Sequence, residues 1–339
     1  MTRLIPLLAA LLIATAAHAE PPGLTQRALP VAHAPGAIEA VIWYPAAAGG
    51  APITYAKNPV FLGVAAREEA PPLAGLHPLV LLSHGLGGNN RSLSWLAAGL
   101  ADKGAIVVAV NHPGSTTSDF DIDRGLNHWT RAADLSAATD AMLADPVFGP
   151  LIDQTRISAA GFSYGGWTAL SVGGLRGNLA GYTAHCDAVG DRSTHCRDLA
   201  KAGVKLSSRD AEKWNADYRD PRISRVVGID AALTWGLTPQ DAAGLQAPAL
   251  LIGLGAGNDR LFATDTRVEG SGFVTLAPQA EVTEIAPATH FTALLTCTKD
   301  GAAILAEEQD DPICTDPPGT DRDAAHAQII AKIAEFLHL

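Results

Sequence analysis

The sequence predicts an α/β protein with a mostly parallel sheet and helices on both faces. Short, continuously apolar runs recur after residue 78, as expected for strands that are buried on both faces. Segments with helical spacing alternate with these runs, and this order is typical of a wound parallel sheet. The chain of 339 residues is 47% hydrophobic and 17% charged, which indicates a large buried core and excludes a disordered protein.

The segments that we expect to be strands share a high apolar content and have turn residues at their ends. Pro45 ends the first segment, and the later segments are runs of mainly Val, Ile, Leu and Ala between Gly, Pro, Asn or Asp residues. In chain order the expected strands are 38–44, 78–83, 105–110, 156–161, 225–229, 249–254 and 282–285.

The expected helices have apolar residues at helical spacing or directly follow a strand. The apolar stripes are Leu93, Leu96, Ala97 and Leu100 in 92–103; Ala132, Leu135, Ala138 and Met142 in 129–143; and Ile329, Ile330, Ile333 and Phe336 in 323–337. A further helix is expected at 164–173, which is rich in small residues and follows the strand at 156–161.

One domain is expected over residues 20–339. Residues 20–37 are rich in Pro and Gly and carry little pattern, and residues 45–77, with many Ala, Gly and Pro residues, predict a segment rich in loops. Residues 175–222 are polar and show no sheet pattern, so they interrupt the alternation of strands and helices. We therefore expect a cap insertion at about 175–222, over the carboxyl edge of the sheet.

The N-terminus has the features of a secretory signal peptide. Arg3 supplies a positive charge, residues 4–17 are mostly apolar, and Ala17-His18-Ala19 forms a small-x-small cleavage site. The apolar run is shorter than the roughly 18 residues that a membrane-spanning helix needs. We expect residues 1–19 to be a signal peptide that is cut after Ala19, a secreted or periplasmic location, and no stable membrane insertion.

The charge pattern argues against a nucleic-acid partner. The formal net charge is −11, and no block of five or more like charges occurs. Phosphate contacts need clusters of Lys and Arg, so a small-molecule partner is expected.

The four cysteines predict disulfides in an oxidising compartment. The simplest pairing joins Cys186 to Cys196 and Cys297 to Cys314. A zinc site made by the His185-Cys186 and His195-Cys196 pairs is the alternative, but the usual short spacing between cysteine ligands is absent. No metal site is therefore expected.

A Gly-x-Ser-x-Gly motif identifies the candidate nucleophile. Gly161-Phe162-Ser163-Tyr164-Gly165 lies between an expected strand and an expected helix, which is the context of a nucleophile elbow. A sharp turn lifts the serine hydroxyl clear of the sheet, and the helix start directs free N–H groups at an oxyanion. We expect Ser163 to be the nucleophile.

The turn after the strand at 78–83 is the candidate oxyanion hole. It reads His84-Gly85-Leu86-Gly87-Gly88 and faces the same sheet edge as the elbow. The N–H of Leu86 is the expected second oxyanion donor beside the N–H of Tyr164. His84 is expected to bond nearby backbone and not to transfer protons.

The general base must follow the serine and the acid in the chain order of such enzymes. His290 follows the last expected strand and is the candidate base, whereas His326 and His338 lie on the last expected helix and are expected at the surface. Two carboxylates compete for the role of the acid. Asp259 is favoured on order and loop length, and Asp230, at the end of the preceding strand, is the alternative.

With these residues in place, the chain resembles the α/β-hydrolases. More narrowly, it is similar to the exported bacterial proteins named predicted dienelactone hydrolases, which are relatives of the platelet-activating-factor acetylhydrolases. The resemblance rests on Trp43-Tyr44-Pro45, Ser83-His84-Gly85-Leu86-Gly87, Gly161-Phe162-Ser163-Tyr164-Gly165-Gly166, His290-Phe291 and the segment from Cys297 to Cys314.

The resemblance implies roles but leaves the acid open. It implies Ser163 as nucleophile, His290 as base and the amides of Leu86 and Tyr164 as the oxyanion hole. The acetylhydrolase-like members carry the acid on the strand of Asp230, and most other α/β-hydrolases carry it at the position of Asp259. True dienelactone hydrolases have a cysteine nucleophile, and the insertion at 175–222 also departs from a minimal acetylhydrolase.

These features predict an exported serine hydrolase that cleaves short- or medium-chain carboxylic esters through an acyl-enzyme without a metal or organic cofactor. A lipid or polyester hydrolase is an alternative. Another is a serine peptidase of the prolyl-oligopeptidase type, although the chain before the first buried run is too short for the large propeller of those enzymes. A silent binding protein on the same fold is the third alternative.

Overall fold

The computed structural model describes residues 20–33 and 36–339, so the predicted signal peptide at 1–19 lies outside the described residues. The described chain forms a 10-stranded sheet in the order β10-β9-β8-β7-β5-β6-β2-β1-β4-β3. The strands are β1 (Gly23–Pro30), β2 (Ala37–Tyr44), β3 (Ala51–Tyr55), β4 (Val64–Glu68), β5 (His77–Ser83), β6 (Ile106–Val110), β7 (Ile152–Phe162), β8 (Ile223–Ile229), β9 (Ala249–Leu254) and β10 (Glu281–Ile285).

The parallel part of the sheet runs from β6 to β10, and its strands are paired side by side in the same direction. Ser83, at the end of β5, lies opposite both Val110 of β6 and Gly161 of β7. The carboxyl ends of these strands therefore meet at one edge. Strand β2 is antiparallel to both β6 and β1 and extends the sheet on the other side, where β1 pairs in parallel with β4.

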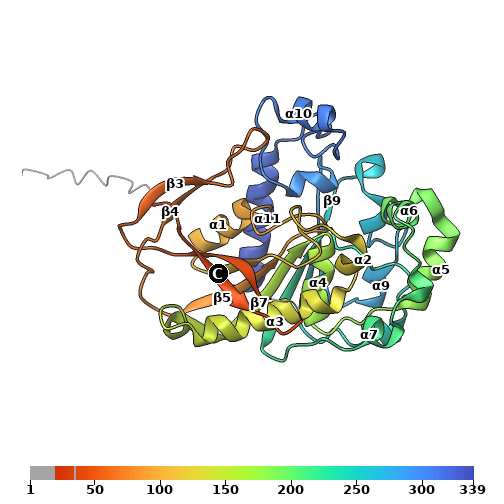
Figure 1. Ribbon diagram of the computed structural model, residues 1–339, viewed down its shortest axis with the longest axis horizontal. Coiled ribbons are helices and arrows are strands. Elements are labelled where there is room, and N and C mark those ends of the chain that lie inside the picture. The colour runs from red at the N-terminus through yellow and green to blue at the C-terminus, as the bar shows by residue number, and fades with distance from the viewer. Residues whose placement is uncertain (1–19, 34–35) are drawn as a thin grey trace, which may run out of the picture.

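Helices cover both faces of the sheet, as the sequence predicts (Figure 1). The α-helices are α1 (Ser94–Asp102), α2 (Ile122–Gly125), α3 (His128–Ala144), α4 (Tyr164–Val172), α5 (Leu179–Val189), α6 (Thr194–Lys201), α7 (Ala211–Asn215), α8 (Pro239–Ala242), α9 (Phe273–Leu276), α10 (Gly301–Glu308) and α11 (Arg322–Leu337). The predictions for α1, α3, α4 and α11 are confirmed to within two residues at each end.

Alternate residues of the central strands pack into separate cores. Leu79 and Leu81 of β5 join the core that α3 and α4 complete. Val80 and Leu82 join the core that α1 and α11 complete. Because successive side chains of a strand point to opposite faces, a continuously apolar strand such as β5 is the one that two helical layers can bury.

The N-terminal part contains strands that the sequence analysis missed. Residues 20–37 carry little sequence pattern but contain β1, and residues 45–77, expected to be rich in loops, contain β3 and β4. Strand β1 pairs with β2 along its whole length, and β4 joins β1 to β3. These strands owe their conformation to pairing more than to a periodic pattern of their own, because β propensity depends strongly on neighbouring strands.

Residues 175–222 contain α5, α6 and α7, which lie at the opposite end of the molecule from β3 and β4 (Figure 1). The disulfide between Cys186 and Cys196 joins α5 to α6. His185 of α5 stacks on Trp235, and Trp235 Nε1–H donates to the carbonyl of Phe262 at 3.1 Å. This segment therefore packs on the loops that follow β8 and β9.

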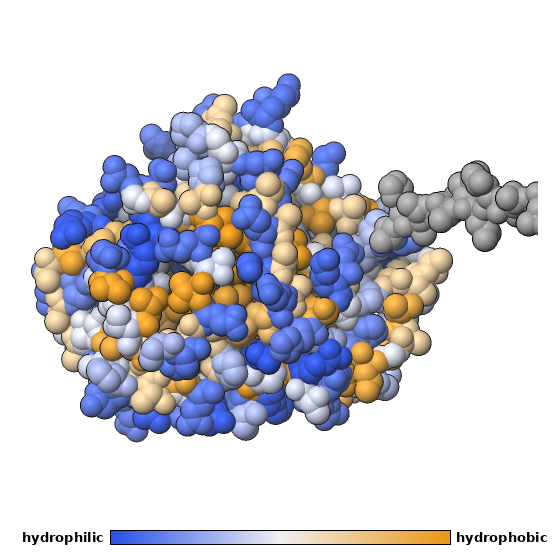
Figure 2. All heavy atoms as spheres, turned by 180° about the vertical axis from the view of Figure 1, so that it is seen from behind, coloured by the Kyte–Doolittle hydropathy of each residue, from blue (hydrophilic) through white to orange (hydrophobic). Residues whose placement is uncertain are grey.

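Seen from behind, apolar side chains gather near the middle of the molecule, among polar and charged side chains (Figure 2).

Over residues 20–33 and 36–339, no helix combines the length and the hydropathy that a membrane span requires.

Candidate active site

The Gly-x-Ser-x-Gly segment forms a sharp turn between β7 and α4. Ser163 has φ 57° and ψ −118°, a strained conformation for a residue with a side chain. A Cβ added at Gly161 would lie 2.1 Å from the carbonyl oxygen of Gly165, and one added at Gly165 would lie 2.0 Å from that of Ser83. Only glycine fits at these positions, so the start of α4 can pack directly against the end of β5.

Ser163, His290 and Asp230 form a continuous hydrogen-bonded series. Ser163 Oγ lies 3.1 Å from His290 Nε2, and His290 Nδ1 lies 2.6 Å from Asp230 Oδ2. His290 is 7% exposed and Asp230 is 1% exposed. Asp230 also accepts from Leu254 N–H and from Thr264 Oγ1–H, each at 2.9 Å. Both carboxylate oxygens are therefore held, and the short contact fixes the ring of His290.

Asp259, the acid favoured from the sequence, is not part of this hydrogen-bonded series. It is exposed in a 3₁₀ turn at Gly257–Asp259, and no hydrogen bond joins it to a histidine in the described part of the chain. Asp230 directly follows β8, which lies next to β7, whereas β9 is one strand further away. The loop after β8 also contacts the elbow directly, because Ala232 N–H donates to the carbonyl of Ser163 at 3.0 Å. The geometry thus reverses the order of the two candidates.

The turn after β5 and the start of α4 lie side by side, as the close approach of Gly165 to Ser83 requires. Within the described residues, the N–H groups of Leu86 and Tyr164 make no hydrogen bond to a protein acceptor. Both belong to the elements that were expected to form the oxyanion hole. Free N–H groups beside a helix N-terminus are suited to stabilise a developing negative charge.

His84 holds the peptide group that carries the Leu86 N–H. His84 Nδ1 lies 2.7 Å from the carbonyl oxygen of Gly85, and His84 Nε2 accepts from His112 N–H at 3.2 Å. Burial lowers the pKa of His84 to about 3. The ring is therefore neutral with its proton on Nδ1, and it bonds nearby backbone as expected.

A second Ser-His-Asp series lies beneath this turn. Ser83 Oγ lies 2.8 Å from His112 Nε2, and His112 Nδ1 lies 2.8 Å from Asp134 Oδ2. All three residues are 0% exposed, so no substrate reaches Ser83. Burial lowers the pKa of His112 and raises that of Asp134.

Arg131 ties this buried series to the oxyanion turn. Its guanidinium donates to the carbonyl of His84, to Ser83 Oγ at 3.2 Å and to Ser115 Oγ at 2.6 Å. It also lies over the ring of Tyr164, with 4.7 Å between the guanidinium carbon and the ring centroid. Burial lowers the pKa of Arg131 to about 10, so it remains a buried cation at neutral pH.

The turn that carries His290 is supported from α11. His326, which was expected at the surface, is buried, stacks on Trp95 at 3.7 Å and lies with Nε2 2.7 Å from the carbonyl oxygen of Thr292. Trp95 Nε1–H donates to the carbonyl of Ala293 at 2.9 Å. The sequence did carry a signal, because His326 lies three residues before Ile329 and thus on the apolar stripe of the helix.

Both predicted disulfides are present: Cys186–Cys196 and Cys297–Cys314. The cysteines of the first pair are therefore not thiolate ligands, which removes the basis of the zinc alternative. Across the described ranges, no group of three or more His, Cys, Asp or Glu side chains is arranged to hold a metal ion.

The described chain has an α/β-hydrolase fold. It superposes on a ferulic acid esterase from Streptomyces cinnamoneus with a TM-score of 0.58 and 20% identity, over 96% of this chain and 91% of the esterase. A profile of the prolyl oligopeptidase family matches residues 91–198, which include the elbow.

Part of the sequence is also similar to Lipase 1 of Moraxella sp. (strain TA144). The two are 38% identical over 82 residues, which are 24% of this chain and 23% of the lipase. The matched segment is thus less than a quarter of the length of the lipase.

Proposed function

We propose that this protein is an exported serine hydrolase that cleaves carboxylic esters of short or medium acyl chains. The contacts Ser163 Oγ–His290 Nε2 and His290 Nδ1–Asp230 Oδ2 carry this proposal. A hydroxyl, an imidazole and a carboxylate in this order are the groups that acyl transfer to serine requires. The lipase and esterase matches support an ester as the substrate.

In the first half-reaction, Ser163 Oγ attacks the ester carbonyl carbon and its proton passes to His290 Nε2. Asp230 stabilises the resulting imidazolium through Nδ1 and remains ionised. The carbonyl oxygen becomes an oxyanion and accepts hydrogen bonds from Leu86 N–H and Tyr164 N–H. Collapse breaks the bond to the alcohol, which leaves with the proton from His290.

In the second half-reaction, His290 takes a proton from water, and the resulting nucleophile attacks the acyl carbon. The same oxyanion donors serve again, and collapse releases the acid and returns the proton to Ser163. Every proton in this cycle moves through His290, so the chemistry needs no metal or organic cofactor.

Several features support the finer parts of the proposal. The disulfides are compatible with a secreted or periplasmic protein. The contact of His290 with Asp230 supports the acetylhydrolase-like arrangement, in which the acid lies on this strand. In the proposal, residues 175–222 act as a cap, because they pack on the loops after β8 and β9.

The test is hydrolysis of p-nitrophenyl esters from acetate to octanoate by the wild type and Ser163→Ala. We expect activity that is highest on the shorter chains in the wild type and none above background in Ser163→Ala. An inactive wild type, or a fully active Ser163→Ala variant, would overturn the proposal. Triglyceride and polyester substrates in the same assay test the alternative of a lipid or polyester hydrolase.

A peptidase is the second candidate, because the prolyl oligopeptidase profile matches residues 91–198. The same site could attack an amide, since peptidases and esterases share the triad chemistry. A proline-containing peptide p-nitroanilide, compared with the matched p-nitrophenyl ester, separates the two. Preference for the anilide would favour the peptidase.

A further inference from the structure

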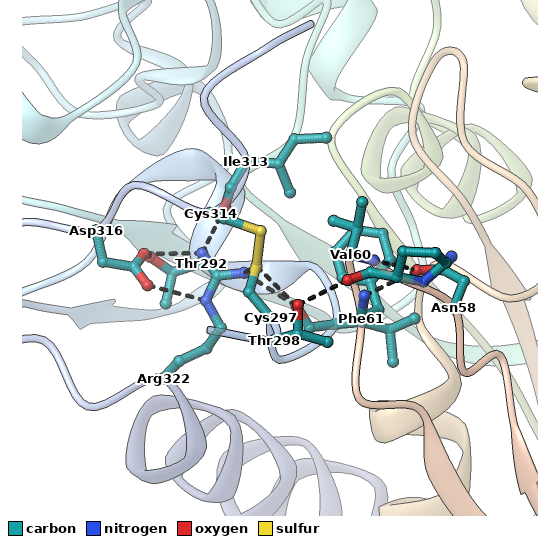
Figure 3. Close-up of a disulfide and its surroundings, with 12 residues drawn as sticks. Asn58, Val60, Phe61, Thr292, Cys297, Thr298, Ile313, Cys314, Asp316 and Arg322 are labelled. Carbon is teal, nitrogen blue, oxygen red and sulfur yellow. Dashed lines mark hydrogen bonds and ion pairs between the residues drawn. A yellow bond between two sulfur atoms is a disulfide. The ribbon is translucent and has the colours of Figure 1, made fainter. Parts of the chain in front are cut away.

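The chain segment after the His290 turn is clamped against the N-terminal part of the protein. Leu62 N–H donates to the carbonyl of Thr296 at 3.0 Å, and Thr298 N–H donates to the carbonyl of Val60 at 2.8 Å. Thr298 Oγ1–H donates to the carbonyl of Pro59 at 2.7 Å. The disulfide then ties this segment, through its Cys297, to the returning chain at residue 314 (Figure 3).

Arg322 of α11 connects both arms of this disulfide loop. Its Nε and Nη2 donate to the two carboxylate oxygens of Asp316, at 2.9 Å and 3.0 Å. Its Nη1 donates to the carbonyl of Leu295 at 3.0 Å, and its Nη2 also donates to the carbonyl of Ile313 at 2.6 Å. Figure 3 shows the guanidinium beside the disulfide, facing Asp316. A bidentate pair of this kind, with the guanidinium buried, fixes direction as well as distance.

Thr292 links Asp316 to the turn that carries His290. Thr292 Oγ1–H donates to Asp316 Oδ1 at 2.7 Å. Thr292 Oγ1 also accepts a hydrogen bond from Thr289 N–H at 2.8 Å. Thr289 and Thr292 flank His290, and Thr292 is fully buried. The backbone N–H just before His290 is therefore bonded to a hydroxyl that lies two residues after His290, and the proton of this hydroxyl is directed to Asp316.

We propose that Asp316 and Arg322 are positioning residues for His290, acting through Thr292, and that the Cys297–Cys314 disulfide keeps them in place. The proposal rests on the proposed function, because it assigns His290 as the base. Cys314 lies two residues before Asp316, so the disulfide limits how far this carboxylate can move from the turn.

The catalytic geometry makes such support consequential. His290 must keep contacts of 2.6 Å and 3.1 Å on opposite sides of its ring at the same time. A displacement of about 1 Å in a catalytic group is enough to cost on the order of 10²-fold in rate. Loss of the support for the turn should therefore lower kcat far more than it changes KM.

The test compares Thr292→Val with Thr292→Ser in the full chain. Valine keeps the shape but removes the hydroxyl, whereas serine restores it. We expect Thr292→Val to lower kcat by about 10- to 100-fold on p-nitrophenyl acetate with little change in KM, and Thr292→Ser to stay close to the wild type. The low-field proton NMR signal of His290 Nδ1–H, assigned with a His290→Ala variant, should weaken or disappear in Thr292→Val alone.

Matched controls are present in the same region. Thr296 Oγ1–H donates to Asp323 at 2.6 Å, so Thr296→Val removes the same kind of bond just beyond the turn. We expect this variant to keep kcat and the NMR signal. The double variant Cys297→Ser/Cys314→Ser should lower kcat, and the cap pair Cys186→Ser/Cys196→Ser should not weaken the signal.

An unchanged kcat and NMR signal in folded Thr292→Val, or an equal loss in Thr296→Val, would overturn the proposal. If Thr292→Val does not fold, Asp316→Asn is measured in its place, because this side chain is partly exposed and keeps its shape. A wild type that hydrolyses no ester but shows the His290 signal would refute the proposed function, and the response of that signal to Thr292→Val would still decide the positioning role.

Discussion

Replacing Asp230 with asparagine should invert the proton positions on His290. Asp230 Oδ1 accepts from Leu254 N–H, and Oδ2 accepts from both Thr264 and His290. An asparagine oxygen that keeps the bond to Leu254 N–H places its NH₂ group against His290 Nδ1. Nδ1 must then be the acceptor, and the ring proton moves to Nε2, where it blocks proton transfer from Ser163.

The opposite orientation of the asparagine side chain in Asp230→Asn would keep the proton on His290 Nδ1, but it is unfavourable. It would point NH₂ at Leu254 N–H inside a site where Asp230 is 1% exposed, and it would leave a buried donor without an acceptor at a cost of about 1–3 kcal/mol. The wrong tautomer in a Ser-His-Asp triad lowers kcat by about 10⁴-fold. That loss corresponds to about 5 kcal/mol of transition-state stabilisation.

The assay is steady-state hydrolysis of p-nitrophenyl acetate by Asp230→Asn, with Asp259→Asn as the matched control. Asp259 is exposed, and it is Asp230 that bonds the ring of His290, so the Asp259 variant should keep nearly wild-type kcat. Circular dichroism of both proteins checks the fold. The reasoning is refuted if Asp230→Asn retains more than about a tenth of the activity, or if Asp259→Asn loses as much.

Other perturbations follow from the buried contacts. Arg131→Leu leaves several buried acceptors unpaired and should lower the free energy of unfolding by at least about 3 kcal/mol, which urea titration measures; a loss below about 1 kcal/mol would contradict the assigned bonds. The hydrogen bond to Asp134 raises the pKa of His33 from 6.5, so its contribution to stability is full below pH 6.5 and is lost as pH rises through the raised value. The stability difference between wild type and His33→Gln should therefore shrink from pH 6 to pH 9, and a pH-independent difference would exclude this linkage. Gly165→Ala would put a Cβ 2.0 Å from the carbonyl oxygen of Ser83, so we expect a lower melting temperature and slow labelling by a serine-directed fluorophosphonate; wild-type behaviour would show that the elbow can relax.

Much of the sheet and the sharp turn that carries the candidate nucleophile were predictable because they depend on local pattern. A strand such as β5 can be recognised from its continuous apolar run, since a strand of a parallel sheet between two helical layers has no polar face. The contact of Ser163 with His290 followed from chain order alone, because both follow parallel strands and thus reach the same edge.

The acid could not be chosen in this way. Asp230 and Asp259 both follow strands that end at that edge, so chain order permits either. What separates them is the local backbone: Asp230 has φ 48° and its carboxylate contacts the ring of His290, whereas Asp259 stands in an exposed turn. Neither property has a pattern in the sequence.

The supports of the histidine turn were missed for another reason. Arg322 and Asp316 are charged residues near the start of the last helix, and charged residues in such positions usually face solvent. The burial of Arg322 depends on contacts with Leu295 and Ile313, which tertiary packing alone brings together. Reading the stripe of α11 one turn further toward its N-terminus would have recovered His326, but not this pair.

The duplicated arrangement of serine, histidine and aspartate has a practical consequence for chemical proteomics. A three-dimensional template of these side chains would match this chain twice, once at Ser163 and once at Ser83. A fluorophosphonate needs open space around the hydroxyl for its leaving group, and Ser83 has none. Peptide mapping of the labelled protein should therefore find the modification on Ser163 and not on Ser83. A structural template that searches for serine hydrolases must thus include the solvent accessibility of the serine.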